Sequence, residues 1–108
     1  MIVLRKVNTN IVEKTIPSGN TEEFFRLDIG EYESFDWNVK ILSDGQRGIT
    51  KISSLYDGIE MESTEYAFLG KQFDTDVSIL ASVDDYCEFK ITNNESLSIR
   101  CSVKVKTF

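Results

Sequence analysis

The stretch LSIRCSVKVKT, which covers residues 97–107, decides the fold of this chain. Its apolar side chains occupy every second position: Leu97, Ile99, Cys101, Val103 and Val105. The positions between them are polar or basic: Ser98, Arg100, Ser102, Lys104 and Lys106. Successive side chains of a β-strand point to opposite faces of its sheet. An alternation of period two therefore predicts a strand with one buried and one exposed face.

The same alternation recurs upstream, and turn-forming residues separate the segments that carry it. Strands are predicted near Ile2–Lys6, Ile11–Ile16, Glu23–Ile29, Ser34–Leu42, Gly48–Tyr56, Ile59–Phe68, Asp76–Val83, Tyr86–Thr92 and Leu97–Thr107. Many short strands at regular spacing are typical of a sandwich or barrel. We expect an all-β protein, an antiparallel β-sandwich that is jelly-roll-like or Ig-like, with about eight or nine strands.

The chain is expected to form a single domain over residues 1–108, because its length and 41% hydrophobic content suffice for a buried core. Residues 1–20 allow two interpretations, since their strands are short and include the proline. They are either an integral part of the sandwich or an arm that docks on a neighbouring subunit. Residues 1–7 are too few and too charged for a signal peptide, and no membrane-spanning run is present. We expect no membrane partner and synthesis in the host cytoplasm.

Local signals specify several turns and one irregularity. Asp57-Gly58 predicts a two-residue hairpin turn, because Asp-Gly favours positive φ values. Asp84-Asp85 and Asn93-Asn94 predict two further hairpins, which would make the last three strands a meander. Between Ile59 and Phe68 the apolar phase changes, so a bulge is predicted near Ser63–Glu65.

The formal net charge of −6 means that the overall field repels the phosphate backbone of nucleic acids. Arg100, Lys104 and Lys106 nevertheless form a basic stripe on the outward face of the last predicted strand. We interpret this stripe as a solvated or edge-protecting strand face. No nucleic-acid partner is expected.

Residue types with catalytic or metal-binding chemistry are scarce. The chain has no histidine and two cysteines, which excludes histidine-based catalysis and a zinc site of the usual ligand number from one chain. Cys87 and Cys101 have the inward phase, could face each other across a ladder, and are expected to be reduced core thiols. Asp74-Thr75-Asp76 offers two calcium-type ligands and then stops, so we interpret these carboxylates as solvated. We expect no catalytic residue, metal, cofactor or enzymatic activity.

Four aromatic residues are candidates for an interaction surface. Phe24 adjoins an inward phenylalanine and is therefore expected to face outward or to lie at a subunit contact. Tyr32 and Tyr86 have the exposed phase, and Phe108 ends the chain. Such residues could contact another subunit or form an aromatic platform for a sugar. Trp37 shares the inward phase of its strand and is expected in the core.

From about Glu33 to the carboxy terminus, a series of segments occurs in a distinctive order. They are FDWNVKI (residues 35–41), SDG (43–45), TKI (50–52), YDG (56–58), STEYA (63–67), FDTDV (73–77), LSI (97–99) and VKVKTF (103–108). In this order and spacing the chain resembles a small β-sandwich domain of tailed-bacteriophage virion structural proteins, found in tail, fibre, neck or capsid-decorating components. It departs from the family's pattern at residues 83–85, where a glycine-rich turn is common, and at residues 93–94, where a proline is common.

The resemblance implies a non-enzymatic structural module and carries no catalytic residue to this chain. It implies a virion protein that attaches to capsid, neck or tail through protein–protein contacts. Its partners would be other virion proteins and copies of itself, in a homo-oligomer. The alternative is a carbohydrate-binding or host-receptor-binding module that uses Phe24, Tyr86 and acidic loop residues to hold a glycan.

Overall fold

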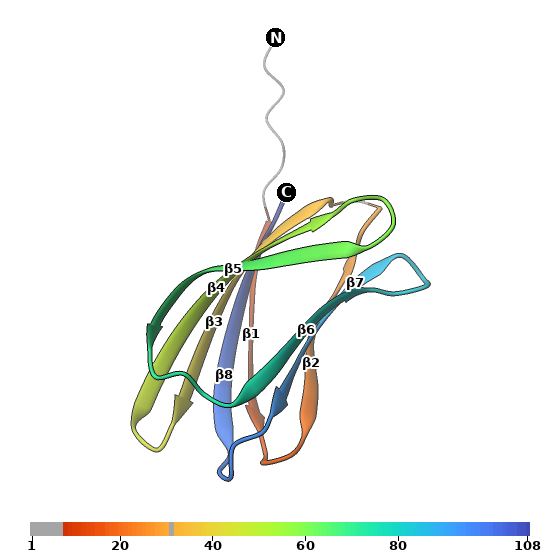
Figure 1. The fold of residues 1–108 in the computed structure, drawn as a ribbon. Coiled ribbons are helices and arrows are strands. Elements are labelled where there is room, and N and C mark those ends of the chain that lie inside the picture. Colours follow the sequence, from red (N-terminus) through yellow and green to blue (C-terminus); the bar gives the residue numbers. More distant parts are fainter. Residues whose placement is uncertain (1–7, 31) are drawn as a thin grey trace.

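In the computed structural model, which describes residues 8–30 and 32–108, the chain forms eight β-strands in two antiparallel sheets (Figure 1). One sheet has the strand order β1-β8-β3-β4-β5, and the other has the order β2-β7-β6. The strands are Asn8–Ile16 (β1), Thr21–Asp28 (β2), Ser34–Ser43 (β3), Gln46–Tyr56 (β4), Met61–Gly70 (β5), Thr75–Ala81 (β6), Tyr86–Asn93 (β7) and Ile99–Thr107 (β8). The predicted all-β antiparallel sandwich is confirmed. Among the described residues, no helix is long and apolar enough to cross a membrane.

The strand order is nested, because β1 pairs with β8 and β2 pairs with β7, while β3, β4 and β5 form a meander. In an immunoglobulin sandwich the first two strands share a sheet. Here β1 and β2 lie in different sheets. The Ig-like alternative therefore does not describe this topology.

The amino-terminal segment contributes to the sandwich from β1 onward. All nine residues of Asn8–Ile16 pair with β8 of the same chain. Ile16 is fully buried at the end of this strand. The predicted strand Ile2–Lys6 lies outside the described residues, so the interpretation of an arm stays a prediction for residues 1–7.

The predicted meander of the last three strands is wrong. β6 and β7 do form a hairpin, with Asp85 at a positive φ of 61° in its turn, but β8 lies in the other sheet. The buried Asn93 side chain explains the difference. Its amide donates to two backbone carbonyls and its oxygen accepts the N–H of Glu95. These bonds direct the chain across the sandwich instead of back along β7.

The tight two-residue turn occurs at Asp44-Gly45, with φ values of 51° and 74° between the paired Ser43 and Gln46. The hairpin predicted at Asp57-Gly58 is present, but its loop spans residues 57–60 and is longer than predicted. The Asp57 carboxylate accepts hydrogen bonds from the backbone N–H groups of Ile59 and Glu60, at 2.8 Å each. These bonds stabilise the longer loop, which the dipeptide signal alone does not distinguish from a tight turn.

The bulge predicted in β5 is present, one residue beyond the predicted range. Consecutive residues of β4 pair with Glu65 and Ala67, so Tyr66 is the inserted residue. Because an inserted residue reverses the phase of a strand, Phe68 points inward like Glu65. The change of apolar phase in the sequence therefore had a real structural cause.

A second bulge, in β2, was not predicted. The pairing of β2 with β7 shifts between Glu23 and Phe25, which leaves Phe24 as the inserted residue. Phe24 and Phe25 are both buried, with 5% and 8% of their surfaces exposed. The Phe24 ring meets Phe89 edge-on, with centroids 6.3 Å apart. The expectation that Phe24 faces outward is wrong, because the bulge places two adjacent residues on the same side.

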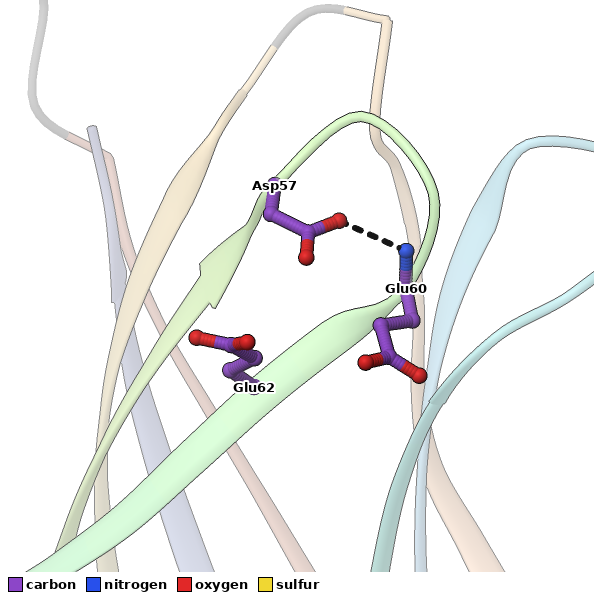
Figure 2. Close-up of side chains that lie close together, drawn as sticks. All are labelled: Asp57, Glu60 and Glu62. Carbon is purple, nitrogen blue, oxygen red and sulfur yellow. Dashed lines mark hydrogen bonds between the residues drawn. The ribbon is translucent and has the colours of Figure 1, made fainter.

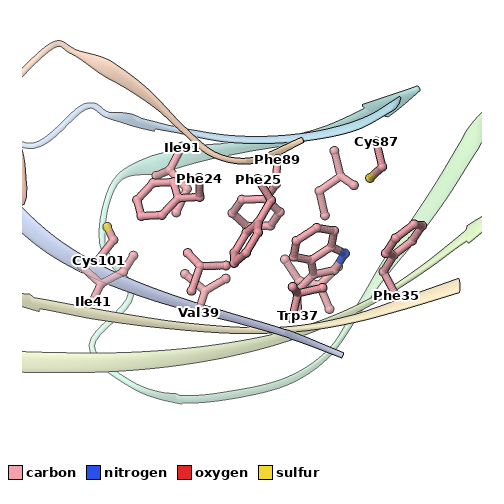
Figure 3. Close-up of a cluster of buried hydrophobic side chains, with 14 of the residues drawn as sticks. Phe24, Phe25, Phe35, Trp37, Val39, Ile41, Cys87, Phe89, Ile91 and Cys101 are labelled. Carbon is pink, nitrogen blue, oxygen red and sulfur yellow. The ribbon is translucent and has the colours of Figure 1, made fainter. Parts of the chain in front are cut away.

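The core lies between the two sheets and is built around aromatic rings (Figure 3). Trp37 is 1% exposed, and its ring stacks on Phe89 at 4.4 Å and on Phe35 at 5.8 Å. Its indole N–H donates to Ser54 Oγ at 3.0 Å, which satisfies the only polar group of the side chain. The inward phases predicted for β3, β7 and β8 are confirmed at these positions.

The predicted inward phase fails at the margins of the core. Val83 is 100% exposed, Leu97 is 55% exposed and Val77 is 37% exposed. Val83 and Leu97 lie in connections between strands, outside β6 and β8. Alternation therefore extended the ends of these two strand predictions too far, whereas Val77 lies within β6 and is exposed because it lines an open hollow at the edge of the sandwich.

Two glycines at the end of the β4–β5 hairpin allow the chain to change sheets. Gly48 pairs with Gly70, which has a φ of 86°. A Cβ atom on Gly48 would collide with the carbonyl oxygen of Lys71, and one on Gly70 with that of Arg47. The close approach is fixed by the Lys71 N–H, which donates to the Arg47 carbonyl at 2.9 Å.

Candidate interaction surfaces

The two long sides of the sandwich differ in how they are closed. On one side β1 lies over β2, and the turn of residues 17–20 joins them. Lys14 of β1 spans this gap: its Nζ donates to the carbonyl of Glu23 at 2.6 Å and lies 5.8 Å from the Phe24 ring centroid. We call this the closed side.

On the opposite side, which we call the open side, the edge strands β5 and β6 make few contacts with each other. Most side chains of β5 are exposed, although the strand contains several large apolar residues. Leu69 is 71% exposed, Tyr66 56% and Phe68 39%. As the edge of its sheet, β5 leaves backbone N–H and C=O groups without a partner strand. A long apolar edge strand of this kind is a template for another chain.

A groove follows the open side between the two sheets. Its two adjoining hollows, of about 190 and 460 Å³, share Ile52, Glu65 and Val77 as lining residues. One hollow adds Phe68, and the other adds Leu80, which is 60% exposed. The groove is therefore apolar, with the Glu65 carboxylate as its charged group common to both hollows.

The outer face of the five-stranded sheet carries most of the described basic residues. They are Lys40, Arg47, Lys51, Arg100, Lys104 and Lys106, all exposed on β3, β4 and β8. Arg100 pairs with Glu13 at 3.2 Å. The interpretation of the stripe on β8 as edge protection is wrong, because β8 lies between β1 and β3 in the interior of the sheet.

The four predicted interface residues do not form one surface. Phe24 is in the core. Tyr32 is half-buried and packs against the core, and Phe108 is half-buried with its backbone bonded to Glu33 and Ser34. Tyr86 is half-buried beneath the Arg26 guanidinium, which lies 4.9 Å from its ring centroid.

The exposed aromatic and aliphatic residues of β5 were missed in the sequence. Tyr66 and Phe68 follow an apolar pattern that predicts a half-buried strand ending at Phe68, and Leu69 lies just beyond that predicted strand. Their only distinguishing signal is the change of phase that marks the bulge. Exposure of an edge strand depends on strand order, which the local sequence does not contain.

Three carboxylates gather at the β4–β5 loop (Figure 2). Oxygen atoms of Asp57, Glu60 and Glu62 lie within 4.8 Å of one another, and all three residues are exposed. Hydrogen bonds from the amides of Glu60 and Ile59 lower the pKa of Asp57 below its usual range. The Asp57 carboxylate thus has a structural role in the loop, and solvated carboxylates alone do not establish a metal site.

The calcium-type pair at the start of β6 is also engaged in the fold. The Asn94 side chain donates to Asp76 Oδ2 at 3.0 Å, and the Asn94 backbone N–H donates to the carbonyl of Asp74. Both acidic side chains are exposed. They hold the β7–β8 connection against β6.

The two cysteines are buried and unpaired. Cys87 lies on β7 and Cys101 on β8, in opposite sheets, and Figure 3 shows them at opposite ends of the core cluster. The expectation that they face each other across a ladder is wrong, whereas their assignment as core thiols is confirmed. Burial raises the pKa of each thiol to about 12, so neither is a reactive thiolate near neutral pH.

No protein-family model matches this sequence, and no curated protein matches it. Among solved structures, the fold is similar to part of the crystal structure of the Acinetobacter phage vB_ApiP_P1 tailspike protein, with a TM-score of 0.44 and 8% sequence identity. The alignment covers 100% of this chain and 24% of the tailspike chain. This chain therefore corresponds to about a quarter of that protein's length.

Proposed function

We propose that this chain is a non-enzymatic structural component of a tailed-bacteriophage virion, which attaches to capsid, neck or tail proteins and to its own copies through the open side of the sandwich. The observation that carries the assembly role is the edge strand β5, which exposes Tyr66, Phe68 and Leu69 and whose Phe68 lines the groove of the open side. The sequence resemblance over residues 33–108 supplies the phage class.

The free-energy cost of leaving β5 exposed to water favours a partner on this side. An exposed edge strand leaves its outward N–H and C=O groups to water, and its apolar side chains lose the free energy of burial. Addition of a strand from another chain satisfies the backbone and covers the side chains together. Glu62 and Glu65 on β5 limit indiscriminate pairing, because an incoming strand must match their charge.

The amino-terminal residues of a neighbouring copy are the occupant with the best chemical match. Ile2, Val3 and Leu4 are strong strand formers, and Arg5 and Lys6 follow them directly. This composition suits an edge that offers apolar side chains and carboxylates. Since residues 8–16 form β1 within their own sandwich, the proposed arm is limited to residues 1–7.

The test compares the full chain with a variant that lacks residues 2–7. We expect the full chain to form a defined oligomer in light scattering after size exclusion, and the truncated chain to be monomeric with an unchanged melting temperature. A monomeric full chain, or a truncated chain that still assembles, would contradict the arm. A variant with Arg5→Ala and Lys6→Ala isolates the contribution of the charges.

The virion role has a separate test. Mass spectrometry of purified phage particles from the source is expected to detect this protein in many copies per particle. Its absence from intact particles would reject the virion assignment. The copy number relative to the major capsid protein would then distinguish a capsid-decorating component from a tail or neck component.

The alternative, carbohydrate or host-receptor binding through Phe24 and Tyr86, has little support at those residues. Phe24 is 5% exposed, and the Tyr86 ring lies against Arg26. A glycan that stacked on either ring would have to displace these contacts. Any saccharide site must therefore use another face of the molecule.

A further inference from the structure

The outer face of the five-stranded sheet contains a hollow of about 260 Å³, which we call the lysine hollow. Its side chains come from four adjacent elements of the sheet: Asp36 and Asn38 of β3, Lys51 of β4, Tyr66 of β5, and Lys104 and Lys106 of β8. Neighbouring strands lie about 4.8 Å apart. Four neighbouring strands therefore span about 14 Å, which leaves room for a sugar ring together with its substituents.

Three ammonium groups surround the lysine hollow, and the Asp36 carboxylate, on the residue that pairs with Lys106, is the acidic group of its lining. Asn38 pairs with Lys104 on one side and with Lys51 on the other, so the two lysines flank it. Within residues 8–30 and 32–108, no ion pair involves these lysines or Lys106. The carboxylate of Asp36 accepts the hydroxyl of Ser53 at 2.9 Å. Like charges gathered in this way attract an anion of the size of the hollow.

The floor of the hollow has a polar atom without a partner. Asn38 Oδ1 is buried and makes no hydrogen bond to the described residues. A buried amide oxygen without a donor costs free energy. Asn38 lies between Lys51 and Lys104, so a turn of its side chain toward the hollow would place this acceptor beside the positive charges, where a ligand hydroxyl can reach it.

The bulge in β5 places an aromatic ring at the margin of the same hollow. Tyr66 is the inserted residue and is 56% exposed at the margin of the hollow. Bulges re-aim side chains, and this one directs an aromatic ring toward a lysine-rich surface. Aromatic faces stack on the apolar faces of ligand rings, while the phenol offers a hydrogen bond at its tip.

We propose that the lysine hollow binds an acidic saccharide, a sugar ring that bears a carboxylate or sulfate. Lys51, Lys104 and Lys106 hold the anionic group. Asn38 Oδ1 accepts a sugar hydroxyl, and the ring rests against Tyr66. The lysines of this site lie on β4 and β8 in the interior of the sheet, whereas Tyr66 lies on the edge strand β5, so strand addition on the open side would place a partner next to the site.

A nucleic acid fits the same surface less well. Its affinity depends on many phosphate contacts, and the rest of this chain is acidic, with a net charge of −6. One aromatic residue at the margin of a hollow of this size suits a single ring better than a continuous backbone. Duplex DNA is therefore included as a competitor in the test.

The test is a titration of the ¹⁵N-labelled full chain with D-glucuronate, followed by NMR, with D-glucose and acetate as matched probes. We expect glucuronate to bind with at least about tenfold higher affinity than either probe. The largest shift changes should map to Asn38 and Tyr66. Equal affinity for acetate would reduce the hollow to a general anion site and overturn the proposal, as would the absence of glucuronate binding at millimolar concentrations.

Three variants locate the site. Lys104→Gln and Tyr66→Ala are each expected to weaken glucuronate binding about tenfold. Lys40→Gln removes the same charge from the same face outside the hollow and should change affinity less than about twofold. Equal losses in the two lysine variants would indicate a diffuse electrostatic effect and overturn the proposal. Duplex DNA that binds more tightly than glucuronate and displaces it would do so as well.

Discussion

The bulges of β2 and β5 each insert one aromatic residue into an edge strand, on opposite sides of the sandwich and with opposite results. In β2 the inserted Phe24 enters the core, and Lys14 covers the gap beside it. In β5 the inserted Tyr66 remains exposed on the outer face of its sheet, and the groove between β5 and β6 stays open. The same backbone irregularity therefore completes the core on one side and creates surface on the other.

The two sides of this small sandwich therefore contribute differently to the free energy of unfolding. Residues of the closed side lose buried area and hydrogen bonds when they are changed. Residues of the open side have little to lose in the isolated chain, so their apolar character is consistent with use in a complex. Stability measurements on matched residues of the two sides can separate these roles.

The largest difference is expected between the two inserted aromatic residues. Phe24→Ala removes a buried ring and should lower the free energy of unfolding by about 4 kcal/mol. Tyr66→Ala should change it by less than about 0.5 kcal/mol, because the side chain is exposed. Urea denaturation followed by Trp37 fluorescence measures both. Similar losses in the two variants would show that the two bulges do not differ in this way.

The next effect concerns the Asn93 side chain, whose hydrogen bonds hold the crossing from β7 to β8. Asn93→Ala removes three hydrogen bonds and leaves the buried carbonyl of Ile16 and the partly buried carbonyl of Leu97 without this donor. We expect a loss of about 3 kcal/mol in the free energy of unfolding. Asn94→Ala, at an exposed neighbour, is the matched control and should cost less than about 1 kcal/mol. If both variants lose the same amount, the Asn93 side chain does not hold the crossing between sheets.

The buried thiols give the core a dependence on alkaline pH. Burial raises the pKa of Cys87 and Cys101 from 9.0 to about 12, so the folded state keeps these protons longer than the unfolded state. The contribution of the thiols to the free energy of unfolding is constant below pH 9. It is lost as the pH rises from 9 toward 12, by up to about 1.4 kcal/mol per pH unit for each thiol.

This dependence can be isolated with a double variant. Urea denaturation at pH 8 and at about pH 10 should show a fall in stability of about 2 to 3 kcal/mol that comes from the thiols. The Cys87→Ala, Cys101→Ala chain should lack this part of the pH dependence. An unchanged slope in the double variant would contradict the thiol effect.

The smallest effect on stability is expected at Leu69. Leu69→Lys on the open side should change the free energy of unfolding by less than about 0.5 kcal/mol. It should nevertheless prevent oligomer formation in light scattering, because a charge at this position disfavours strand addition. Leu97→Lys, at an exposed leucine away from the open side, is the control and should leave the oligomer intact.

Much of the candidate surface could not be predicted. The alternation of β3, β7 and β8 identified the core around Trp37 and Phe89, because a strand buried on one face must repeat with period two. The exposed Tyr66, Phe68 and Leu69 follow the same type of pattern. What separates them from core residues is that β5 has no neighbour on one side, a property of the whole sheet.

The lysine hollow illustrates the same limit. The basic stripe on the last strand was visible in the sequence, and its outward phase was correct. Lys51 and Tyr66 come from two other strands, and only the pairing of β8 with β3 and of β3 with β4 brings them beside it. Register across a sheet is a long-range property that no local window contains.

The sequence by itself determined that this protein is an antiparallel all-β sandwich, since strand periodicity and turn residues are local and every segment displays them. It also determined that the two cysteines are apolar core residues. Only the tertiary structure decided that β7 and β8 lie in different sheets, that Phe24 is buried, and that β5 is an open edge. These properties depend on strand order, bulges and the Asn93 side chain, which act between residues far apart in the chain.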